Sequence, residues 1–356
     1  MAISRIKLYN FRSYDLYEAE FGASGTVIVG PNGTGKTNLL EAVYVALRGT
    51  SFRGSLGDVM QHDASQTIVQ LDTDHGARRV ELLRATLGKV NKEFIIDDAH
   101  MKLLPRKRRE SVVLFEPSEL RLITSSPARR RDFLDGVLSR LDAQFEATLR
   151  AFNRTLLQRN ELLKHHSEDS AGWRDHLFAW DVKFVQLATS VANARAHFLY
   201  THESTIGELY ASLAGAKTPF SIEYQPSVSL ENYEQSLLDR LQRARDYEVA
   251  TGHTSAGPHR EDFTINLHNQ PAIKVASRGE MRTIMLAFKL LELDLQSNLS
   301  DSAPIILMDD VFSELDATRE KLLQETIQRH QFIITTTDTR HQKDGGVIIS
   351  TQHSQK

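Results

Sequence analysis

The chain has 356 residues, of which 40% are hydrophobic and 25% are charged, and it contains no cysteine. This balance is ordinary for a globular protein, and the length favours two domains or one domain with a large insertion. The lack of cysteine excludes disulfides and thiolate metal sites. The formal net charge is −3, so the charge of the whole molecule does not indicate a nucleic-acid-binding protein.

Targeting signals and membrane segments are not expected in this sequence. Residues 1–11 carry Arg5 and Lys7 among their apolar side chains and lack the apolar core and the cleavage site of a signal peptide. No apolar run approaches the ~20 residues that a membrane-spanning helix needs. We therefore expect a cytoplasmic protein with no membrane partner.

The first third of the chain predicts strands around one helix. Residues 3–8 partly alternate and predict a half-exposed strand, whereas residues 25–29 form a β-branched run that predicts a buried one. A helix is expected from Lys36, with apolar residues at helical spacing, and Gly49 ends it. Further strands are expected at residues 67–71, 79–84 and 93–96, which form an antiparallel meander, and at 111–115.

The middle of the chain is predicted to be helical, and strands return near its end. Residues 128–213 contain few glycines, no proline and apolar stripes at helical spacing, which favours a pair of long helices. Buried strands are expected at 304–308 and 331–334, and residues 346–349 are a candidate for a last strand. The sequence thus predicts an α/β fold whose sheet is built from both ends of the chain. We expect an N-terminal part at 1–127, a helical insertion at 128–250 and a C-terminal part at 251–356.

The most specific motif is a phosphate-binding loop of the form G-x-x-x-x-G-K-[ST]. A predicted buried strand precedes it and a predicted amphipathic helix follows it, as this motif requires. The glycines allow the backbone N–H groups to surround phosphates, Lys36 would bind the β- and γ-phosphates, and the Thr37 hydroxyl would bind Mg²⁺. The nucleotide-binding residues expected here are Gly30, Pro31, Asn32, Gly33, Thr34, Gly35, Lys36, Thr37 and Asn38.

Two adjacent carboxylates supply the second half of such a site. Asp309 and Asp310 directly follow the predicted strand at 304–308. We expect Asp309 to be a Mg²⁺ ligand and Asp310 to be the carboxylate that activates water. GTP is the alternative nucleotide, but the Asn91-Lys92 pair is followed by Glu93 and Phe94 instead of the N-K-x-D motif that reads guanine. ATP is therefore favoured, with Mg²⁺ as its metal.

The segment after these carboxylates resembles the ABC and SMC ATPases. Residues 309–316, DDVFSELD, resemble a Walker B strand running into a D-loop of the form S-x-L-D, which implies that Asp316 contacts nucleotide. Residues 276–280, ASRGE, resemble the ABC signature and imply roles for Ser277 and Gly279. The form S-R-G-[QE] is similar to that of the RecF family. ABC transporters carry a histidine after the next strand, where this chain has residues 335–338, TTTD.

Three further blocks strengthen the resemblance to RecF proteins. Residues 10–12, NFR, resemble a motif of SMC-like ATPases in which the arginine, here Arg12, touches ATP phosphate. Residues 126–135, SPARRRDFLD, and residues 257–262, GPHRED, are similar to blocks specific to the RecF family. The ordered set spans nearly the whole chain. It implies an ABC-type ATPase head with a P-loop core, an antiparallel β meander and an inserted α-helical lobe.

The resemblance also implies a mechanism and partners. Two copies are expected to dimerise around ATP, with Lys36 of one and Ser277 of the other on the same nucleotide, so that hydrolysis releases the dimer. Lys36, Ser277 and Asp310 are the expected catalytic residues. The dimer is expected to bind duplex DNA near single-strand gaps, where with RecR and RecO it would help to load RecA. Turnover is expected to be slow and stimulated by DNA.

A local excess of positive charge is the candidate DNA-binding feature. Between Arg78 and Arg131 there are fourteen Lys and Arg against seven Asp and Glu, a balance of +7. A basic face on a neutral protein can bind phosphates, although a merely solvated surface has the same composition. The expected DNA contacts are Arg106, Lys107, Arg108, Arg109, Arg129 and Arg130.

Other functions are alternatives to this one, and the sequence excludes only some of them. An ABC transporter ATPase would place its signature and Walker B motif closer to the P-loop than this chain does. A full SMC protein would insert a long coiled coil with sustained heptads, which are absent here, although another SMC-like repair ATPase stays open. An ATP-binding DNA scaffold with negligible turnover also stays open, because Asp310 is one methylene shorter than the glutamate of fast ABC enzymes.

Overall fold

The computed structural model describes residues 1–85, 89–165, 172–299, 302–338 and 347–350. The chain divides into two compact units. The boundary between Leu291 and Glu292 falls within one helix, α8 (Arg278–Leu299). The first unit comprises Met1–Ser118 and Glu292–Lys356, and the second comprises Glu119–Leu291.

A five-stranded parallel sheet in the first unit draws its strands from both ends of the chain, as predicted. The strand order is β14-β3-β13-β12-β8, and every neighbouring pair is parallel. All five residues of β3 and of β13 are buried, which is the pattern of a parallel sheet covered on both faces. The strands are β3 (Gly25–Val29), β8 (Val112–Phe115), β12 (Ile305–Asp309), β13 (Phe332–Thr336) and β14 (Val347–Ser350).

A six-stranded antiparallel sheet in the same unit contains the predicted meander. Its order is β2-β1-β4-β5-β6-β7, so consecutive strands from β4 to β7 are neighbours. Buried and partly exposed residues alternate along β4 and the middle of β5, because one face of the sheet packs on the core. The strands are β1 (Ile3–Phe11), β2 (Tyr14–Glu20), β4 (Gln66–Thr73), β5 (Gly76–Arg84), β6 (Val90–Ile96) and β7 (Ala99–Met101).

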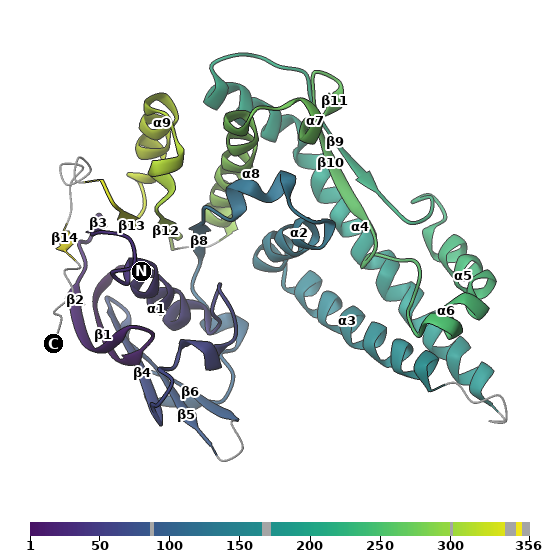
Figure 1. Ribbon diagram of the computed structural model, residues 1–356, viewed down its shortest axis with the longest axis horizontal. Coiled ribbons are helices and arrows are strands. Elements are labelled where there is room, and N and C mark those ends of the chain that lie inside the picture. The colour runs from purple at the N-terminus through teal and green to yellow at the C-terminus, as the bar shows by residue number, and fades with distance from the viewer. Residues whose placement is uncertain (86–88, 166–171, 300–301, 339–346, 351–356) are drawn as a thin grey trace. The chain divides into compact units, whose positions relative to one another are not determined.

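Helix α1 (Lys36–Arg48) supplies much of the core of this unit (Figure 1). Leu39, Leu40 and Val43 are fully buried in a cluster that includes side chains of both sheets. The helix ends where predicted, at Gly49, whose φ of 73° is the left-handed conformation that glycine adopts without strain. The other helical segments of the unit are η1 (Leu56–Val59), η3 (Arg106–Arg108), η5 (Val311–Glu314) and α9 (Ala317–Ile327).

The second unit is dominated by helices, as predicted for residues 128–213. The long helices α3 and α4 pack side by side (Figure 1). Asp142 is the N-cap of α3, and its side chain accepts a hydrogen bond from the backbone N–H of Gln144 at 2.7 Å. The helices are α2 (Pro127–Leu141), α3 (Ala143–Lys164), α4 (Trp173–Ala214), α5 (Tyr233–Arg243), α6 (Arg245–Thr251), α7 (Ala272–Val275) and α8 (Arg278–Leu299), with the 3-10 helix η4 (Glu119–Thr124).

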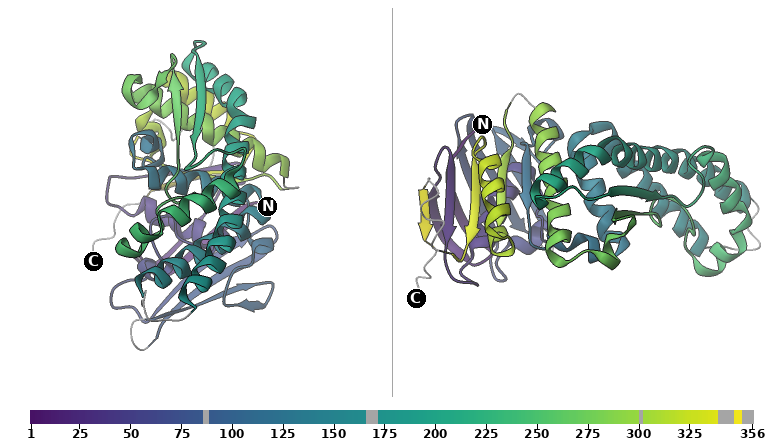
Figure 2. Two further views of the ribbon diagram at one scale, coloured as in Figure 1. Left: turned by 90° about the vertical axis from the view of Figure 1, so that its right-hand side faces the viewer. Right: turned by 90° about the horizontal axis from the view of Figure 1, so that it is seen from above.

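A small antiparallel sheet, which the sequence did not predict, completes the second unit. Its order is β11-β10-β9, and Figure 2 shows β9 and β10 as adjacent strands. The bounds are β9 (Phe220–Gln225), β10 (Asp262–Leu267) and β11 (Gln270–Pro271). The unit thus extends beyond the predicted insertion at 128–250 in both directions, because η4 and the segment from β10 to α8 belong to it. That the compact units are also functional domains stays a proposal.

Among the described residues, no helix combines the length and the apolar character that crossing a bilayer requires.

A buried ion network holds α3, α4 and α6 of the second unit together. The Arg159 side chain is 1% exposed, and its Nε and Nη2 donate to Asp181 at 2.7 Å and to Glu248 at 2.6 Å. Its Nη1 donates to the Thr254 hydroxyl at 2.8 Å. Burial raises the pKa of Asp181, and the Arg159 guanidinium opposes that shift. Glu248 also accepts from the backbone N–H and the hydroxyl of Ser255. Among the described residues, Arg159 is the one cation that donates hydrogen bonds to both carboxylates, so it supplies much of their compensation.

We predict that Arg159→Met destabilises this unit by about 3–5 kcal/mol, because the substitution leaves two buried carboxylates without their cation. Denaturant unfolding followed by the fluorescence of Trp173 and Trp180, the two tryptophans of the chain, measures it, since both lie in α4. The loss should shrink as the pH falls. A carboxyl whose pKa is raised in the folded state binds more protons there than in the unfolded state, so acid favours the folded form.

The matched control is Arg154→Met, the same replacement at an exposed position of α3. Equal unfolding midpoints for the two variants would contradict a structural role for the buried network.

Candidate nucleotide-binding site

The predicted phosphate loop joins β3 to α1 at the carboxyl edge of the parallel sheet. Gly33 and Gly35 have φ of 83° and 94°, which glycine adopts readily. A Cβ at Gly35 would also lie 2.8 Å from the Tyr14 hydroxyl and 2.9 Å from Ser13 Oγ, so these side chains would have to move to admit one. Gly35 is the N-cap of α1 and provides no side-chain cap. The first N–H groups of the helix are thus left to bind an anion.

Lys36 is held against the loop by its own backbone. Its Nζ donates to the carbonyl oxygens of Gly30 at 2.6 Å and Pro31 at 2.8 Å, and the residue is 6% exposed. Burial lowers the pKa of Lys36, while Asp310 and Asp309 act in the opposite direction. A cation that is already desolvated at the loop is suited to bind phosphate oxygens.

The remaining loop residues make local contacts. Thr34 Oγ1 donates to the Pro31 carbonyl at 2.9 Å, which closes the loop on itself. Asn38 donates to Ser13 Oγ at 3.0 Å and accepts from Arg53 Nη1 at 2.9 Å. Asn32 is exposed.

The two predicted metal-binding residues meet in the structure. Thr37 Oγ1 lies 2.8 Å and 3.0 Å from the carboxylate oxygens of Asp309, although the two residues are 272 positions apart. Asp309 ends β12, and Thr37 stands in the first turn of α1. The hydroxyl and the carboxylate are the oxygen ligands that Mg²⁺ takes in P-loop sites.

Thr335 is a site residue to which the sequence analysis gave no role. Its hydroxyl donates to Asp309 Oδ1 at 2.7 Å and accepts from the Asp310 backbone N–H at 3.0 Å. Thr335 is fully buried near the end of β13, where the parallel register places it opposite Asp309. The sequence could have indicated Thr335 only if the predicted strands 304–308 and 331–334 had been placed side by side in the correct parallel register.

The Asp310 backbone is in an uncommon conformation. Its φ of 48° lies in the left-handed region, which costs energy for a residue other than glycine and is frequent at functional sites. Its Oδ1 is buried and has no hydrogen-bond partner among the described residues. A buried carboxylate oxygen in this state is available to accept a proton or a hydrogen bond from a ligand.

Arg12 is anchored by a buried glutamate that the sequence analysis missed. Its Nε and Nη2 donate to Glu41 at 2.9 Å and 2.8 Å, and Glu41 is fully buried in α1. Ser51 donates to the same carboxylate. Arg12 has a φ of 51° and follows β1 directly, so the chain turns at this point. The predicted phosphate contact of Arg12 stays a prediction.

Ser277 and Gly279 belong to the second unit, at the start of α8. The Ser277 backbone N–H donates to Glu280 at 2.8 Å, and the Glu280 N–H donates to Ser277 Oγ at 3.2 Å. This reciprocal pair is a capping box, which explains physically why Glu stands at position 280. Ser277 is exposed, so its hydroxyl can also reach a ligand.

Asp316 caps the next helix. Its carboxylate accepts from the Arg319 backbone N–H at 3.0 Å at the start of α9 and forms an ion pair with the Arg319 side chain. Its predicted contact with nucleotide stays a prediction.

The basic run at 106–109 is partly engaged within the first unit. Arg108 Nη1 pairs with Asp97 at 2.6 Å, and Arg109 Nε donates to the Leu104 carbonyl at 3.1 Å. Arg106 is half-buried, whereas Lys107 is exposed. Their predicted DNA contacts stay predictions.

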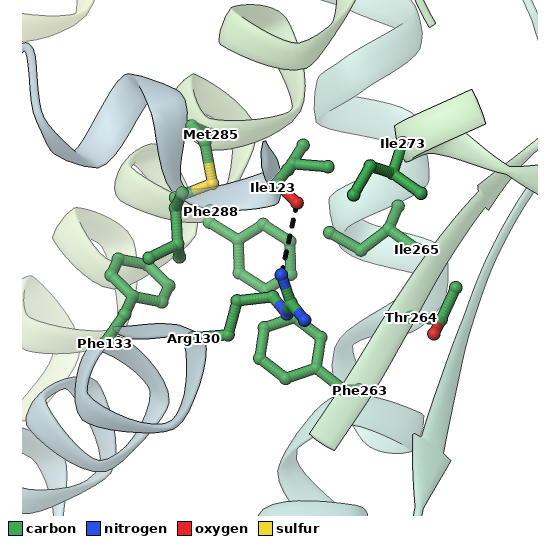
Figure 3. Close-up of a pocket in the computed structure, with 10 residues that line it drawn as sticks. Ile123, Arg130, Phe133, Phe263, Thr264, Ile265, Ile273, Met285 and Phe288 are labelled. Atoms are coloured by element: carbon green, nitrogen blue, oxygen red, sulfur yellow. Dashed lines mark hydrogen bonds between the residues drawn. The ribbon is translucent and has the colours of Figure 1, made fainter. Parts of the chain in front are cut away.

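The other two predicted DNA contacts lie in the second unit and differ from each other. Arg129 is exposed, but Arg130 donates to Asp262 at 2.9 Å and to the Ile123 carbonyl at 3.3 Å. Figure 3 shows Arg130 among the apolar side chains of a pocket of about 460 Å³. Arg131 donates to the Glu261 carbonyl at 2.8 Å. The two RecF-like blocks at 126–135 and 257–262 therefore fold against each other.

Comparison with known proteins agrees with this geometry. The family model for the RecF/RecN/SMC N terminal domain matches residues 2–356. The DNA replication and repair protein RecF of Deinococcus deserti is 33% identical over 99% of this chain and 94% of its own length. RecF of Tropheryma whipplei is 34% identical over 94% of this chain and 92% of its own length.

Solved structures give the same result. The recombination mediator protein RecF with ATP, from the RecFOR pathway, superposes with a TM-score of 0.84 at 27% identity, over 97% of this chain and 94% of that one. An Smc head bound to the C-terminal winged-helix domain of ScpA has a TM-score of 0.53 at 16% identity, over 98% of this chain and 94% of that one, and shares the fold. The chain therefore belongs to the RecF/RecN/SMC family and, within it, to the RecF proteins.

Proposed function

We propose that this chain is a Mg²⁺-dependent ATPase of DNA repair and recombination that dimerises on ATP. The observation that carries the proposal is the meeting of Thr37 with Asp309 beside an uncapped helix N-terminus and a buried lysine. The solved RecF with ATP supports ATP as the nucleotide. The RecF relatives support replication and repair as the process.

The oxygen atoms of Thr37 and Asp309 fit a magnesium ion that is also bound by the phosphates of the nucleotide. Among the described residues, no group of three or more His, Asp or Glu side chains is arranged to hold a metal. A hydroxyl and one carboxylate suit Mg²⁺, which keeps several waters and takes phosphate oxygens from its nucleotide. When bound, the ion would neutralise charge that develops on the phosphates. Thr37 and Asp309 would hold it, and Thr335 would keep Asp309 oriented.

The chemical step is the attack of water on the γ-phosphate. Asp310 accepts a proton from that water through its buried oxygen as the new P–O bond forms and the bond to ADP breaks. Lys36 and the first N–H groups of α1 stabilise the negative charge on the phosphates. The products are ADP and inorganic phosphate.

Dimerisation completes the site in this proposal. Ser277 of one copy would bind the γ-phosphate of ATP held by Lys36 of the other, together with the N-terminus of α8. ATP then favours the dimer and hydrolysis releases it. The dimer would bind duplex DNA near gaps and, with RecR and RecO, help to load RecA. The RecFOR pathway of the solved relative supports these partners.

A scaffold that binds ATP and DNA with negligible turnover is the second candidate. The Asp310 Oδ1 has no hydrogen-bond partner among the described residues, and its backbone is left-handed. Both features favour an enzyme, because strained backbone conformations are concentrated at active sites. Turnover with and without duplex DNA separates the two, since a scaffold would show no DNA-stimulated phosphate release.

We predict that Asp310→Asn keeps ATP binding but slows single-turnover hydrolysis by roughly 10²–10⁴-fold, the usual contribution of a general base. ATP-stable dimers should accumulate, because release requires hydrolysis. Quenched-flow phosphate release and light scattering measure the two effects. Asp294→Asn, an exposed position of α8, is the matched control, and hydrolysis by Asp310→Asn at the control rate would assign the base to another residue.

We predict that Lys36→Met and Ser277→Arg each abolish ATP-driven dimerisation, the first by losing phosphate binding and the second by blocking a contact made only in trans. An equimolar mixture should recover dimers with one sound site, which pairs wild-type Lys36 with wild-type Ser277. Light scattering and the ATP bound per dimer measure this. Ser204→Arg, exposed on α4, should dimerise normally, and two ATP per mixed dimer would contradict assembly in trans.

A further inference from the structure

The helices α3 and α4 enclose a surface hollow that the proposed function does not use. The hollow measures about 740 Å³, is open to solvent and is lined by Arg150, Ala151, Arg154, Thr155 and Lys183. Four of these residues lie on α3 and one lies on α4, so the hollow exists only where the two helices pack side by side (Figure 1). We call it the α3–α4 basic groove.

The groove carries an excess of positive charge. Arg150, Arg154 and Lys183 are exposed, with 64% of the Arg150 side chain accessible. None of the five described residues that line the groove is acidic. Glu146 lies 3.9 Å from Arg150 and is mostly buried, with 14% of its side chain exposed. Three cations against this one carboxylate leave two positive charges in excess, which repel one another until an anion binds.

The spacing of the cations suits a chain of phosphates. Arg150 and Arg154 lie one turn apart on α3, where residues at this spacing are neighbours about 5–6 Å apart at Cβ. Lys183 reaches the groove from the other helix, and its Nζ lies 5.2 Å from the centre of the half-buried Trp180 ring. Ala151 and the buried Thr155 are small, so they leave room between the cations.

We propose that the α3–α4 basic groove binds the phosphate backbone of duplex DNA. The inference rests on the proposed DNA-binding function and names a surface for it. Arginine binds phosphate through two N–H groups at once, and an open groove with several cations suits a polyanion better than a single small anion. Contacts of this kind position a protein on DNA without reading its sequence.

This surface differs from the basic residues that the sequence indicated. Arg108 and Arg130 pair with carboxylates inside their units. In contrast, Arg154 and Lys183 line an open groove and are exposed. All residues that line the groove belong to the second unit, whereas the phosphate loop belongs to the first. Replacement of the groove cations is therefore expected to leave ATP binding intact.

The test is the affinity for fluorescein-labelled duplex DNA, measured by anisotropy with ATP over a series of salt concentrations. Replacing Arg150, Arg154 and Lys183 together by Ala should weaken binding roughly tenfold or more on every sequence. It should also reduce the log–log salt slope by about 2–3, since each lost phosphate contact contributes about 0.9. ATP-driven dimerisation should match that of the wild type.

The matched control replaces Arg174, Lys217 and Arg243, three exposed cations of the same unit outside the groove, by Ala. The control has the same change in net charge and should keep its affinity and salt slope. Equal losses in both variants would overturn the proposal, because net charge alone would explain them. Unchanged binding by the groove variant would overturn it as well.

Failure of the proposed function gives a different result. If the wild type itself does not bind duplex DNA with ATP, then the DNA-binding function falls and the groove proposal with it. If the wild type binds duplex DNA and the groove variant binds it with the same affinity and salt slope, the groove proposal is rejected and the DNA-binding function stands. Arg154→Gln is also measured as a single change. A folding defect of the triple variant, seen as a loss of helical circular dichroism, then does not decide the outcome.

Discussion

The carboxylate of Asp309 is the point on which the first unit depends. It accepts hydrogen bonds from Thr37, which follows the phosphate loop, and from Thr335, on the neighbouring strand. The three residues come from opposite ends of the sequence and meet only when β3, β13 and β12 lie in one parallel sheet. Folding of that sheet therefore builds the nucleotide site. The intervening 173 residues, Glu119–Leu291, can form a compact unit of their own without interrupting it.

The second unit depends on buried charges instead of a continuous sheet. Arg159 holds two carboxylates, and Arg195 pairs with Asp135 at 2.7 Å while donating to the Pro258 carbonyl. Glu261 is 2% exposed and accepts from the hydroxyls of Tyr224 and Tyr233 and from the Ser227 amide. Removing one member of such a network leaves a buried group uncompensated, which is costly. This explains why residues of the RecF-like blocks at 126–135 and 257–262 carry so many charges in a packed interior.

Sequence alone predicted what local patterns encode. The phosphate loop, the buried strands and the α1 boundary at Gly49 each carry their signal within a few residues. Thr335 and Glu41 were missed because their roles come from partners that are distant in the chain. Charge counting identified the 106–109 run but could not show that Asp97 pairs with Arg108. The α3–α4 basic groove could not be predicted from the sequence, because its cations come from two helices and lie close together only when these helices pack.

We propose that Asp309, oriented by Thr335, binds the Mg²⁺ that accompanies bound ATP. Titration calorimetry of ATP binding at increasing Mg²⁺ concentrations tests this role of Asp309 most directly. In the wild type, Mg²⁺ should tighten ATP binding, and in Asp309→Asn it should not. Thr335→Val should need about 10–100-fold more Mg²⁺ for the same effect, as is usual when a metal ligand loses its supporting hydrogen bond, and Thr335→Ser should behave as the wild type. An identical Mg²⁺ dependence in the wild type and Asp309→Asn would contradict the claim.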